Sequence, residues 1–221
     1  MKLVLFDLDN TLLDGDSDYE WAQFLITKGV LDREIYERRN EEFYKAYVAG
    51  VLDIDEFLDF QLKPLGQHKR SQLDLWHSEF MSQKVRPMIT QGARDLVQKY
   101  HSDLVAIVTA TNSFITKPIA EEFGIENLIA TEPEQVDGEF TGGVVGLPSF
   151  REGKVTRVHE WLRSIGRTWE SFDETIFFSD SINDLPLLNE VSVPVVVDPD
   201  INLLQHAKSV GWEVLSLRDE P

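Results

Sequence analysis

The chain has 221 residues and a formal net charge of −18, from 21 basic and 39 acidic residues. This length suits one large or two small domains, and a hydrophobic content of 42% is ordinary for a globular protein. The acidic balance argues against nucleic acid or an anionic membrane surface as a partner. The absence of cysteine excludes disulfides, zinc–thiolate sites and cysteine nucleophiles.

The sequence contains no apolar stretch near the roughly 20 residues that a membrane-spanning helix needs. It begins directly with a predicted strand instead of a signal peptide, so we expect a cytoplasmic protein. No pattern in the sequence indicates an oligomeric state.

Residues 3–7 form an apolar run that ends in Asp7, and Asp9 follows two residues later. Such a run is typical of a buried strand in a parallel sheet. Residues i and i+2 of an extended chain point the same way, so both carboxyls can face one reacting centre. One carboxylate can attack an electrophile and form a covalent intermediate, while the other serves as general acid and base. The alternative is that Asp-Asn-Thr is only a turn or a cap.

Residues 16–86 differ from the rest, because their apolar residues recur at helical spacing. With breaks at Gly29, Gly50 and Pro64, this pattern predicts about four helices, a small bundle inserted after the first strand. Most of its aromatic side chains are expected to form the core of the bundle, although some could stack on a flat substrate ring. Asp16 precedes an apolar run and suits a helix N-cap.

After residue 86 the sequence alternates between predicted strands and helices, which indicates right-handed crossovers and a parallel sheet. The predicted strands are 104–108, 127–131, 175–179 and 193–197, and the predicted helices are 90–100, 113–123, 152–164 and 201–207. Asp137-Gly138 predicts a hairpin turn. The fold class is therefore α/β, a doubly wound parallel sheet. We expect a core formed by residues 1–15 and 87–221 and a helical cap formed by residues 16–86.

Two later segments carry groups that suit phosphate. Thr109 ends the second predicted strand, and Ala110 leads into a polar helix start whose hydroxyl and free N–H groups can bind an anion. An ordinary N-cap is the alternative. Lys154 lies at the start of a helix, where a cation opposes the helix dipole, so it is expected to face an anionic group. For Lys154, and for Arg151 before it, a solvated surface position is the alternative.

The predicted strand 175–179 is followed by Asp180, Asn183 and Asp184. Parallel strands deliver their carboxyl ends to one edge of a sheet, so Asp180 is expected close to Asp7. Oxygen ligands suit Mg²⁺, which would neutralise the carboxylates and orient a phosphoryl group. Asp184 could hold the lysine, and Asn183 could donate to a phosphate oxygen. A simple Ser- and Asn-rich turn is the alternative.

The order of these segments is DxDxT after the first strand, a strand ending in Thr, a lysine, and a strand followed by DxxxD. Over the whole chain this order resembles the haloacid dehalogenase-like (HAD) superfamily of phosphohydrolases. The resemblance implies Mg²⁺ as cofactor, held by the Asp7 and Asp180 carboxylates and the backbone carbonyl of Asp9. The other roles it implies are Asp7 as nucleophile, Asp9 as general acid and base, Thr109 as phosphate-binding hydroxyl, Lys154 as the cation beside phosphate, and Asp184 as the second acid of the last motif.

The helical insertion looks like the cap of the phosphoserine-phosphatase-like branch, subfamily IB. That branch usually has Ser-Gly-Gly where this chain has Thr-Ala-Thr at 109–111, and Gly-Asp-Gly-x-Asn-Asp where it has Ser-Asp-Ser-Ile-Asn-Asp at 179–184. Segments such as Phe-Arg-Glu-Gly-Lys-Val at 150–155 look closer to a bacterial group described as histidinol-phosphatases. In the branch, an acid at the position of Asp16 faces a substrate amine.

The predicted function is hydrolysis of a small amine-bearing phosphomonoester through an aspartyl-phosphate, with L-histidinol phosphate as the lead substrate. A phosphoserine phosphatase and a phosphotransferase are the alternatives within the branch. A haloalkanoate dehalogenase would not need an acid at Asp9. A non-catalytic phosphate sensor is the distant alternative, and it would bind phosphate without turning anything over.

Overall fold

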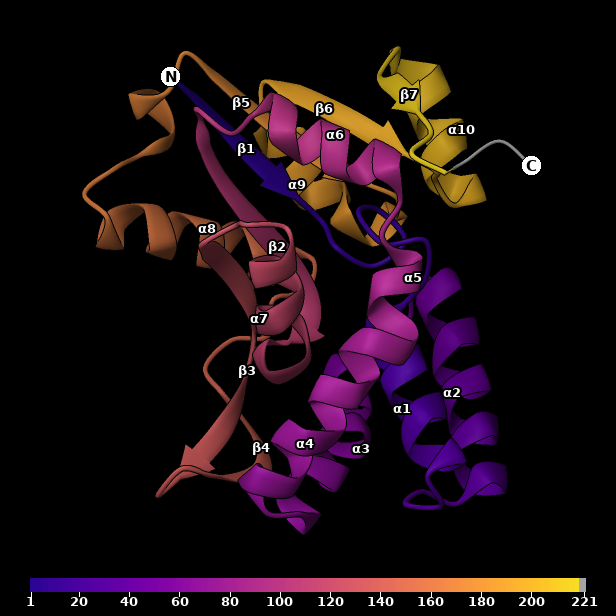
Figure 1. The fold of residues 1–221 in the computed structure, drawn as a ribbon. Coiled ribbons are helices and arrows are strands. Elements are labelled where there is room, and N and C mark those ends of the chain that lie inside the picture. The colour runs from indigo at the N-terminus through magenta and orange to yellow at the C-terminus, as the bar shows by residue number, and fades with distance from the viewer. Residues whose placement is uncertain (219–221) are drawn as a thin grey trace.

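A computed structural model describes residues 1–218 and contains a seven-stranded sheet with the strand order β4-β3-β2-β1-β5-β6-β7 (Figure 1). The strands are β1 (Lys2–Phe6), β2 (Leu104–Asn112), β3 (Asn127–Val136), β4 (Glu139–Val145), β5 (Glu174–Ser179), β6 (Val193–Val197) and β7 (Glu213–Leu215). The pairings are parallel except that β4 runs antiparallel to β3. The predicted α/β fold is confirmed, and β1 lies at the centre of the sheet.

Both faces of the sheet are covered by helices, as expected for a doubly wound fold. Along β1, Val4 and Phe6 belong to one hydrophobic cluster, whereas Leu3 and Leu5 belong to another. This alternation follows from the opposite directions of successive side chains on a strand. The helices of the sheet region are α6 (Gln91–Lys99), α7 (Ser113–Glu122), α8 (Glu152–Ser164), α9 (Leu185–Glu190) and α10 (Ile201–Val210). Neither α9 nor the short strand β7 was predicted from the sequence.

Four further helices, which we call the cap helices, lie together beside the carboxyl ends of β1 and β2 (Figure 1). They are α1 (Ser17–Thr27), α2 (Arg33–Val48), α3 (Ile54–Gln67) and α4 (Arg70–Phe80), the last continuing through a π-helical turn (Met81–Val85) into α5 (Arg86–Met88). Trp21 packs against Phe24 and Phe80 with ring centroids 5.7 and 5.2 Å apart. We retain as a proposal the division into a core of residues 1–15 and 87–221 and a cap of residues 16–86.

The β3–β4 hairpin connects the sheet to the cap helices. Its turn has positive φ at Asp137 and Gly138, as a tight two-residue hairpin turn requires. The hairpin packs on α3 at Gly66, where an added Cβ would lie 2.5 Å from the carbonyl oxygen of Thr141. The backbone N–H of Arg70 also donates to Glu139 at 2.6 Å. Glycine is therefore required at Gly66 for the backbones to approach this closely.

None of the helices in the described residues combines the length and apolar character needed to cross a membrane.

Candidate active site

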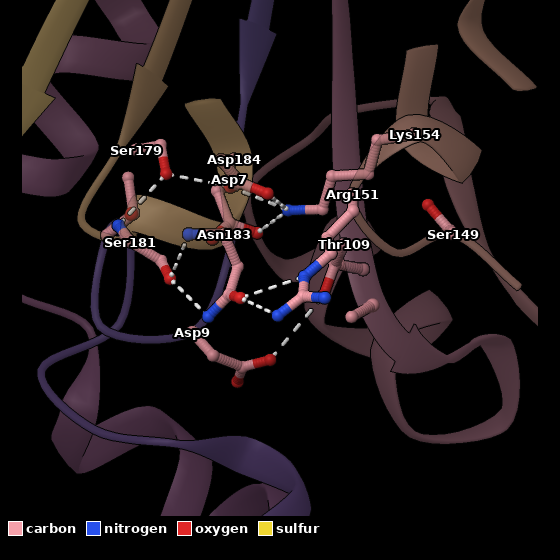
Figure 2. A network of polar contacts seen from close by, with 12 residues as sticks. Asp7, Asp9, Thr109, Ser149, Arg151, Lys154, Ser179, Ser181, Asn183 and Asp184 are labelled. Atoms are coloured by element: carbon pink, nitrogen blue, oxygen red, sulfur yellow. Dashed lines mark hydrogen bonds and ion pairs between the residues drawn. The ribbon is translucent and has the colours of Figure 1, made fainter. Parts of the chain in front are cut away.

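Asp7 directly follows β1, where pairing with the neighbouring strand β5 fixes its backbone. Its N–H donates to the carbonyl of Phe178 at 2.9 Å, and its side chain is buried. Figure 2 shows that Lys154, from the first turn of α8, extends to this carboxyl group. Lys154 Nζ lies 3.0 Å from Asp7 Oδ1 and 2.7 Å from Asp184 Oδ1. The structure thus brings Asp7, Lys154 and Asp184 together as one buried cluster.

Burial and the neighbouring charges set the pKa values of the groups in this cluster. Burial alone would lower the pKa of Lys154, but Asp184 and Asp7 outweigh that effect and raise it above its usual range. Burial also raises the pKa of Asp7, and the ammonium group of Lys154 offsets part of that rise. The negative charges of Asp184, Asp180 and Asp9 raise the pKa of Asp7 further. The site therefore carries more negative charge than one lysine can balance.

Asp184 is held rigidly by two donors. Besides Lys154, the hydroxyl of Ser179 donates to Asp184 Oδ2 at 2.7 Å, and the Ser179 oxygen accepts the N–H of Ser181 at 3.2 Å. Asp184 is only 3% exposed. In this position Asp184 orients Lys154 beside Asp7 at the end of β1.

Asp9 lies two residues beyond Asp7 and accepts hydrogen bonds on both oxygens. Its Oδ1 accepts the N–H of Ser17 at 2.6 Å, and its Oδ2 accepts the hydroxyls of Thr111 at 2.8 Å and Thr109 at 3.5 Å. The strand β2 continues to Asn112, so Thr109 and Thr111 share one face of it. The sequence analysis placed the end of this strand at Thr109 and gave Thr111 no role of its own, although the i, i+2 spacing of the two threonines could have indicated one.

Ala110 lies between these two threonines, and its carbonyl accepts the hydroxyl of Thr131 at 2.8 Å. This bond fastens the end of β2 to β3. The helix that follows is capped by Asn112, whose side chain accepts the N–H of Ile115 at 3.2 Å. An ordinary N-cap was one of the two interpretations of this segment, and Asn112 is that N-cap. The hydroxyls of Thr109 and Thr111 instead donate to Asp9.

Asp180 follows β5 and accepts the hydroxyl of Thr11 on Oδ1 at 3.0 Å. Burial and the nearby Asp184 raise the pKa of Asp180 to about 8. Within residues 1–218, the Oδ2 atoms of Asp7 and Asp180 accept no hydrogen bond from the protein. The buried Asp7 and the partly buried Asp180, each with a carboxylate oxygen without a protein partner at adjacent strand ends, form a donor set that suits a cation.

No group of three or more His, Cys, Asp or Glu side chains within the described residues is arranged as a complete metal cage. Mg²⁺ does not require one, because it keeps several waters and is usually held by one or two carboxylates. The Asp7 and Asp180 carboxylates with the Asp9 backbone carbonyl therefore fit Mg²⁺ as a ligand set.

Arg151 and Asn183 connect the cap helices to the sheet region. Arg151 donates to Asn183 Oδ1 from Nε at 3.1 Å and from Nη2 at 2.9 Å, and Nη2 reaches the carbonyl of Gly50 at 2.6 Å. The carbonyl of Tyr47 accepts Asn183 Nδ2 at 3.3 Å, and the Tyr47 hydroxyl donates to Ser181 Oγ at 2.6 Å. We call these five residues the latch. The sequence analysis named Arg151 and Asn183 for phosphate or substrate binding but missed Tyr47 and Ser181.

Asp16 is the N-cap of α1, as one of its two interpretations predicted. Its Oδ1 accepts the N–H groups of Asp18 and Tyr19, both at 2.9 Å. The next residue, Ser17, donates its N–H to Asp9, so the start of α1 directly adjoins Asp9. A role for the exposed Asp16 in binding an amine stays a prediction.

Comparisons with known proteins agree with this geometry. A model of the haloacid dehalogenase-like hydrolase family matches residues 4–189. A histidinol-phosphatase from Neisseria meningitidis serogroup C (strain 8013) is 46% identical, over 98% of this chain and 99% of that protein. A crystal structure of a protein of unknown function from Bordetella pertussis Tohama I has a TM-score of 0.92 at 46% identity, with 98% and 99% of the two chains covered.

A phospho-aspartyl intermediate analogue of phosphoserine phosphatase shares the fold, with a TM-score of 0.70 at 19% identity over 99% of this chain and 94% of that one. The family model spans most of the chain and every acidic motif described above. The chain therefore belongs to the haloacid dehalogenase-like hydrolase family and is a phosphatase of that family.

Proposed function

We propose that this phosphatase hydrolyses L-histidinol phosphate with Mg²⁺ as cofactor and an aspartyl-phosphate formed on Asp7. The observation that carries the chemistry is the buried contact of 3.0 Å between Asp7 Oδ1 and Lys154 Nζ. It places a carboxylate at a strand end beside a fixed positive charge, which suits attack on an anionic phosphoryl group. A small-molecule phosphomonoester as partner and a cytoplasmic location belong to the same proposal.

In the first step, an oxygen of Asp7 attacks phosphorus and forms the new P–O bond while the bond from phosphorus to the substrate alcohol breaks. Protonated Asp9 gives its proton to the departing alkoxide. Lys154 stabilises the charge on the phosphoryl oxygens from its fixed position, and the Thr109 hydroxyl is placed to donate to one of them. The hydrogen bonds that Asp9 accepts from Ser17 and Thr111 hold its carboxyl group in place.

In the second step, Asp9 removes a proton from water, and the oxygen of that water attacks phosphorus. The bond between phosphorus and Asp7 breaks, which releases inorganic phosphate and restores both carboxyl groups. Mg²⁺ held by Asp7, Asp180 and the Asp9 carbonyl would supply positive charge beside the transferring phosphoryl group. The latch closes the cap helices over the site, which favours the proposed attack by excluding bulk water in the first step.

The substrate proposal rests on two observations. The relative from Neisseria meningitidis, 46% identical over nearly the whole chain, is named histidinol-phosphatase. Several carboxylates, including Asp16 and Asp18, lie at the start of α1 beside Asp9, where a cationic substrate group is favoured.

The test is phosphate release with Mg²⁺ from L-histidinol phosphate, phosphoserine, phosphothreonine, sugar phosphates and nucleotides. We expect the highest kcat/KM with L-histidinol phosphate, and loss of activity after EDTA treatment and dialysis that added Mg²⁺ restores. Activity that survives removal of divalent ions would refute the magnesium assignment. A flat profile would refute the substrate but leave the phosphatase chemistry in place.

A further inference from the structure

Asp9 must both give and take a proton in the proposed mechanism, and its two carboxylate oxygens have partners of different chemistry. Oδ1 accepts the backbone N–H of Ser17, the first residue of α1, at 2.6 Å. Oδ2 accepts the hydroxyl of Thr111 at 2.8 Å and lies 3.5 Å from the hydroxyl of Thr109. One oxygen of Asp9 is thus bound by a peptide group and the other by hydroxyl groups.

These partners differ in how they tolerate a proton on Asp9. A peptide N–H can only donate, so a proton on Oδ1 would weaken the bond from Ser17, which is fully buried and has no solvent to replace it. A threonine hydroxyl has a proton and lone pairs, so it can donate to an ionised carboxylate and accept from a protonated one. The proton that Asp9 transfers therefore belongs on Oδ2, beside Thr111.

The two threonines hold Oδ2 to different degrees. A separation of 2.8 Å is ordinary for a hydrogen bond between a hydroxyl and an oxygen, whereas 3.5 Å is long for one. The oxygen of Thr109, which Figure 2 shows beside Asp9, also accepts the backbone N–H of Thr111 at 3.2 Å. The Thr109 hydroxyl therefore stays available to a phosphoryl group, and Thr111 is the partner that orients Oδ2.

The backbone of β2 is shaped to bring these hydroxyls to Asp9. Between two successive pairs of β2 with β3, three residues of β2 (109–111) face one residue of β3. Such a bulge re-aims side chains and is common beside active sites. The hydroxyl of Thr131 donates to the carbonyl of Ala110, inside the bulge, at 2.8 Å. The position of Thr111 is therefore fixed by the backbone of the strand end.

We infer that Thr111 is the positioning residue of the acid and base steps, and that its hydrogen bond with Asp9 reverses direction as the proton moves. This inference rests on the proposed function and deepens it. Before the first step, Asp9 carries its proton on Oδ2 and donates to the Thr111 oxygen. As that proton passes to the departing alkoxide, the Thr111 hydroxyl turns and donates to the ionised Oδ2. In the second step a proton from water arrives at Oδ2 and the hydroxyl turns back, so Thr111 keeps its own proton throughout.

The test uses two substrates that need different help from Asp9. The alkoxide of L-histidinol phosphate must be protonated as it leaves, whereas 4-nitrophenolate departs without a proton. Thr111→Val removes the hydroxyl at nearly constant volume, and Thr111→Ser keeps a hydroxyl. Thr109→Val is the matched variant, because its hydroxyl is placed to serve the phosphoryl group that both substrates share. Thr131→Val removes the hydroxyl that supports the bulge, and thermal unfolding checks the fold of every variant.

We expect Thr111→Val to lower kcat/KM for L-histidinol phosphate by about 10-fold, as for loss of a hydrogen bond to a charged group. The change with 4-nitrophenyl phosphate should stay within about 2-fold, because its first step needs no proton from Asp9. Thr111→Ser should remain within about 3-fold of wild type on both substrates, since a hydroxyl can still donate and accept.

The other two variants should behave differently from Thr111→Val. Thr109→Val and Thr131→Val should each lower kcat/KM by the same factor on both substrates. Inhibition by inorganic phosphate should weaken in Thr109→Val and stay unchanged in Thr111→Val. If wild type prefers another alkyl phosphomonoester to L-histidinol phosphate, the same comparison with that ester has the same expected results.

An equal loss on both substrates in Thr111→Val would overturn the inference, because Thr111 would then serve the phosphoryl group or the strand end. Wild-type kcat/KM on both substrates, or a Thr111→Ser variant as impaired as Thr111→Val, would overturn it too. In each of these cases the proposed function survives as long as Asp9→Asn loses activity selectively on the alkyl phosphate. Failure of the proposed function itself would appear in Asp9→Asn as an equal loss, or as no loss, on the two substrates.

Discussion

The cluster around Asp7 at the ends of β1 and β5 and the residues Asp18 and Asn40 of the cap helices are both buried and polar, but their polar atoms are paired differently. Lys154 contacts two carboxylates, and Asp9 accepts three hydrogen bonds. Among the residues that the structure describes, Asp18 Oδ2 and Asn40 Nδ2 in the cap helices are buried and have no hydrogen-bond partner. The first region is organised before any substrate arrives, as electrostatic catalysis requires. The second keeps unpaired polar atoms in the interior of the cap helices, each of which costs about 1–3 kcal/mol of stability.

The largest effect is expected at the nucleophile. Asp7→Asn should lower kcat by at least roughly 10⁴-fold, because the amide cannot attack phosphorus. The fold should persist, since Lys154 keeps its contact of 2.7 Å with Asp184. Rapid-quench phosphate release and thermal unfolding measure the two parts. Activity close to that of wild type would remove Asp7 from the nucleophile role.

Asp9→Asn should lower kcat by about 10²-fold or more with an alkyl phosphate, as expected for lost general acid catalysis. The loss should be smaller with 4-nitrophenyl phosphate, whose leaving group departs without a proton. Steady-state kinetics with both substrates check this difference. If both fall equally, Asp9 acts by holding Ser17 and the start of α1 and not by donating a proton.

A substitution in the latch, which connects the cap helices to the sheet region, should have a smaller effect on activity. Tyr47→Phe removes the hydrogen bond of 2.6 Å to Ser181 and should lower kcat/KM by about 3- to 10-fold, because a neutral hydrogen bond contributes about 1 kcal/mol to closure. Tyr44→Phe is the matched control, since Tyr44 is 67% exposed on the same helix. Equal kcat/KM values for Tyr47→Phe and Tyr44→Phe would show that the latch does not control closure of the cap helices over the site.

The smallest effect concerns a polar group of the cap that already has its partner. His77 is buried between Trp21 and Phe114, and its Nε2 lies 3.0 Å from the carbonyl of Ile115. Burial lowers the pKa of His77 below its ordinary value of 6.5. The unfolded chain therefore binds a proton at a higher pH than the folded protein does. The stabilisation is complete above about pH 6.5 and is lost as pH falls through the folded-state value.

His77→Gln keeps an amide donor for the Ile115 carbonyl but cannot titrate. We expect it to flatten the fall in free energy of unfolding between about pH 7 and pH 5, measured by urea denaturation. His101→Gln, at an exposed histidine, should leave that slope unchanged. An unchanged slope in His77→Gln would show that other groups cause the pH dependence.

The sequence predicted the sheet and the positions of the acidic motifs because both depend on short patterns. The apolar runs before Asp7 and Asp180 end within one residue of β1 and β5, which pair in register, whereas β2 and β3 extend beyond their predicted ends. The sequence could not predict the contact of Tyr47 with Ser181, since the two residues are 134 positions apart and no motif marks Tyr47 as its partner. It also missed β7 and α9, which are too short to show a clear period. The buried polar residues Asp18 and Asn40 could not be predicted for a similar reason, because they lie on different helices, α1 and α2.

The central place of β1 in the sheet has a consequence for how the enzyme acquires activity during synthesis. β1 is synthesised before β5, its neighbour in the sheet, and the contact between Asp7 and Lys154 spans 147 residues. The contact of Thr11 with Asp180 spans 169. Contacts over such separations form late, because long loops must close first. Recovery of turnover in a refolding experiment should therefore trail the recovery of helical signal, and a nascent chain that ends before β5 contains Asp7 but neither Asp180 nor Asp184.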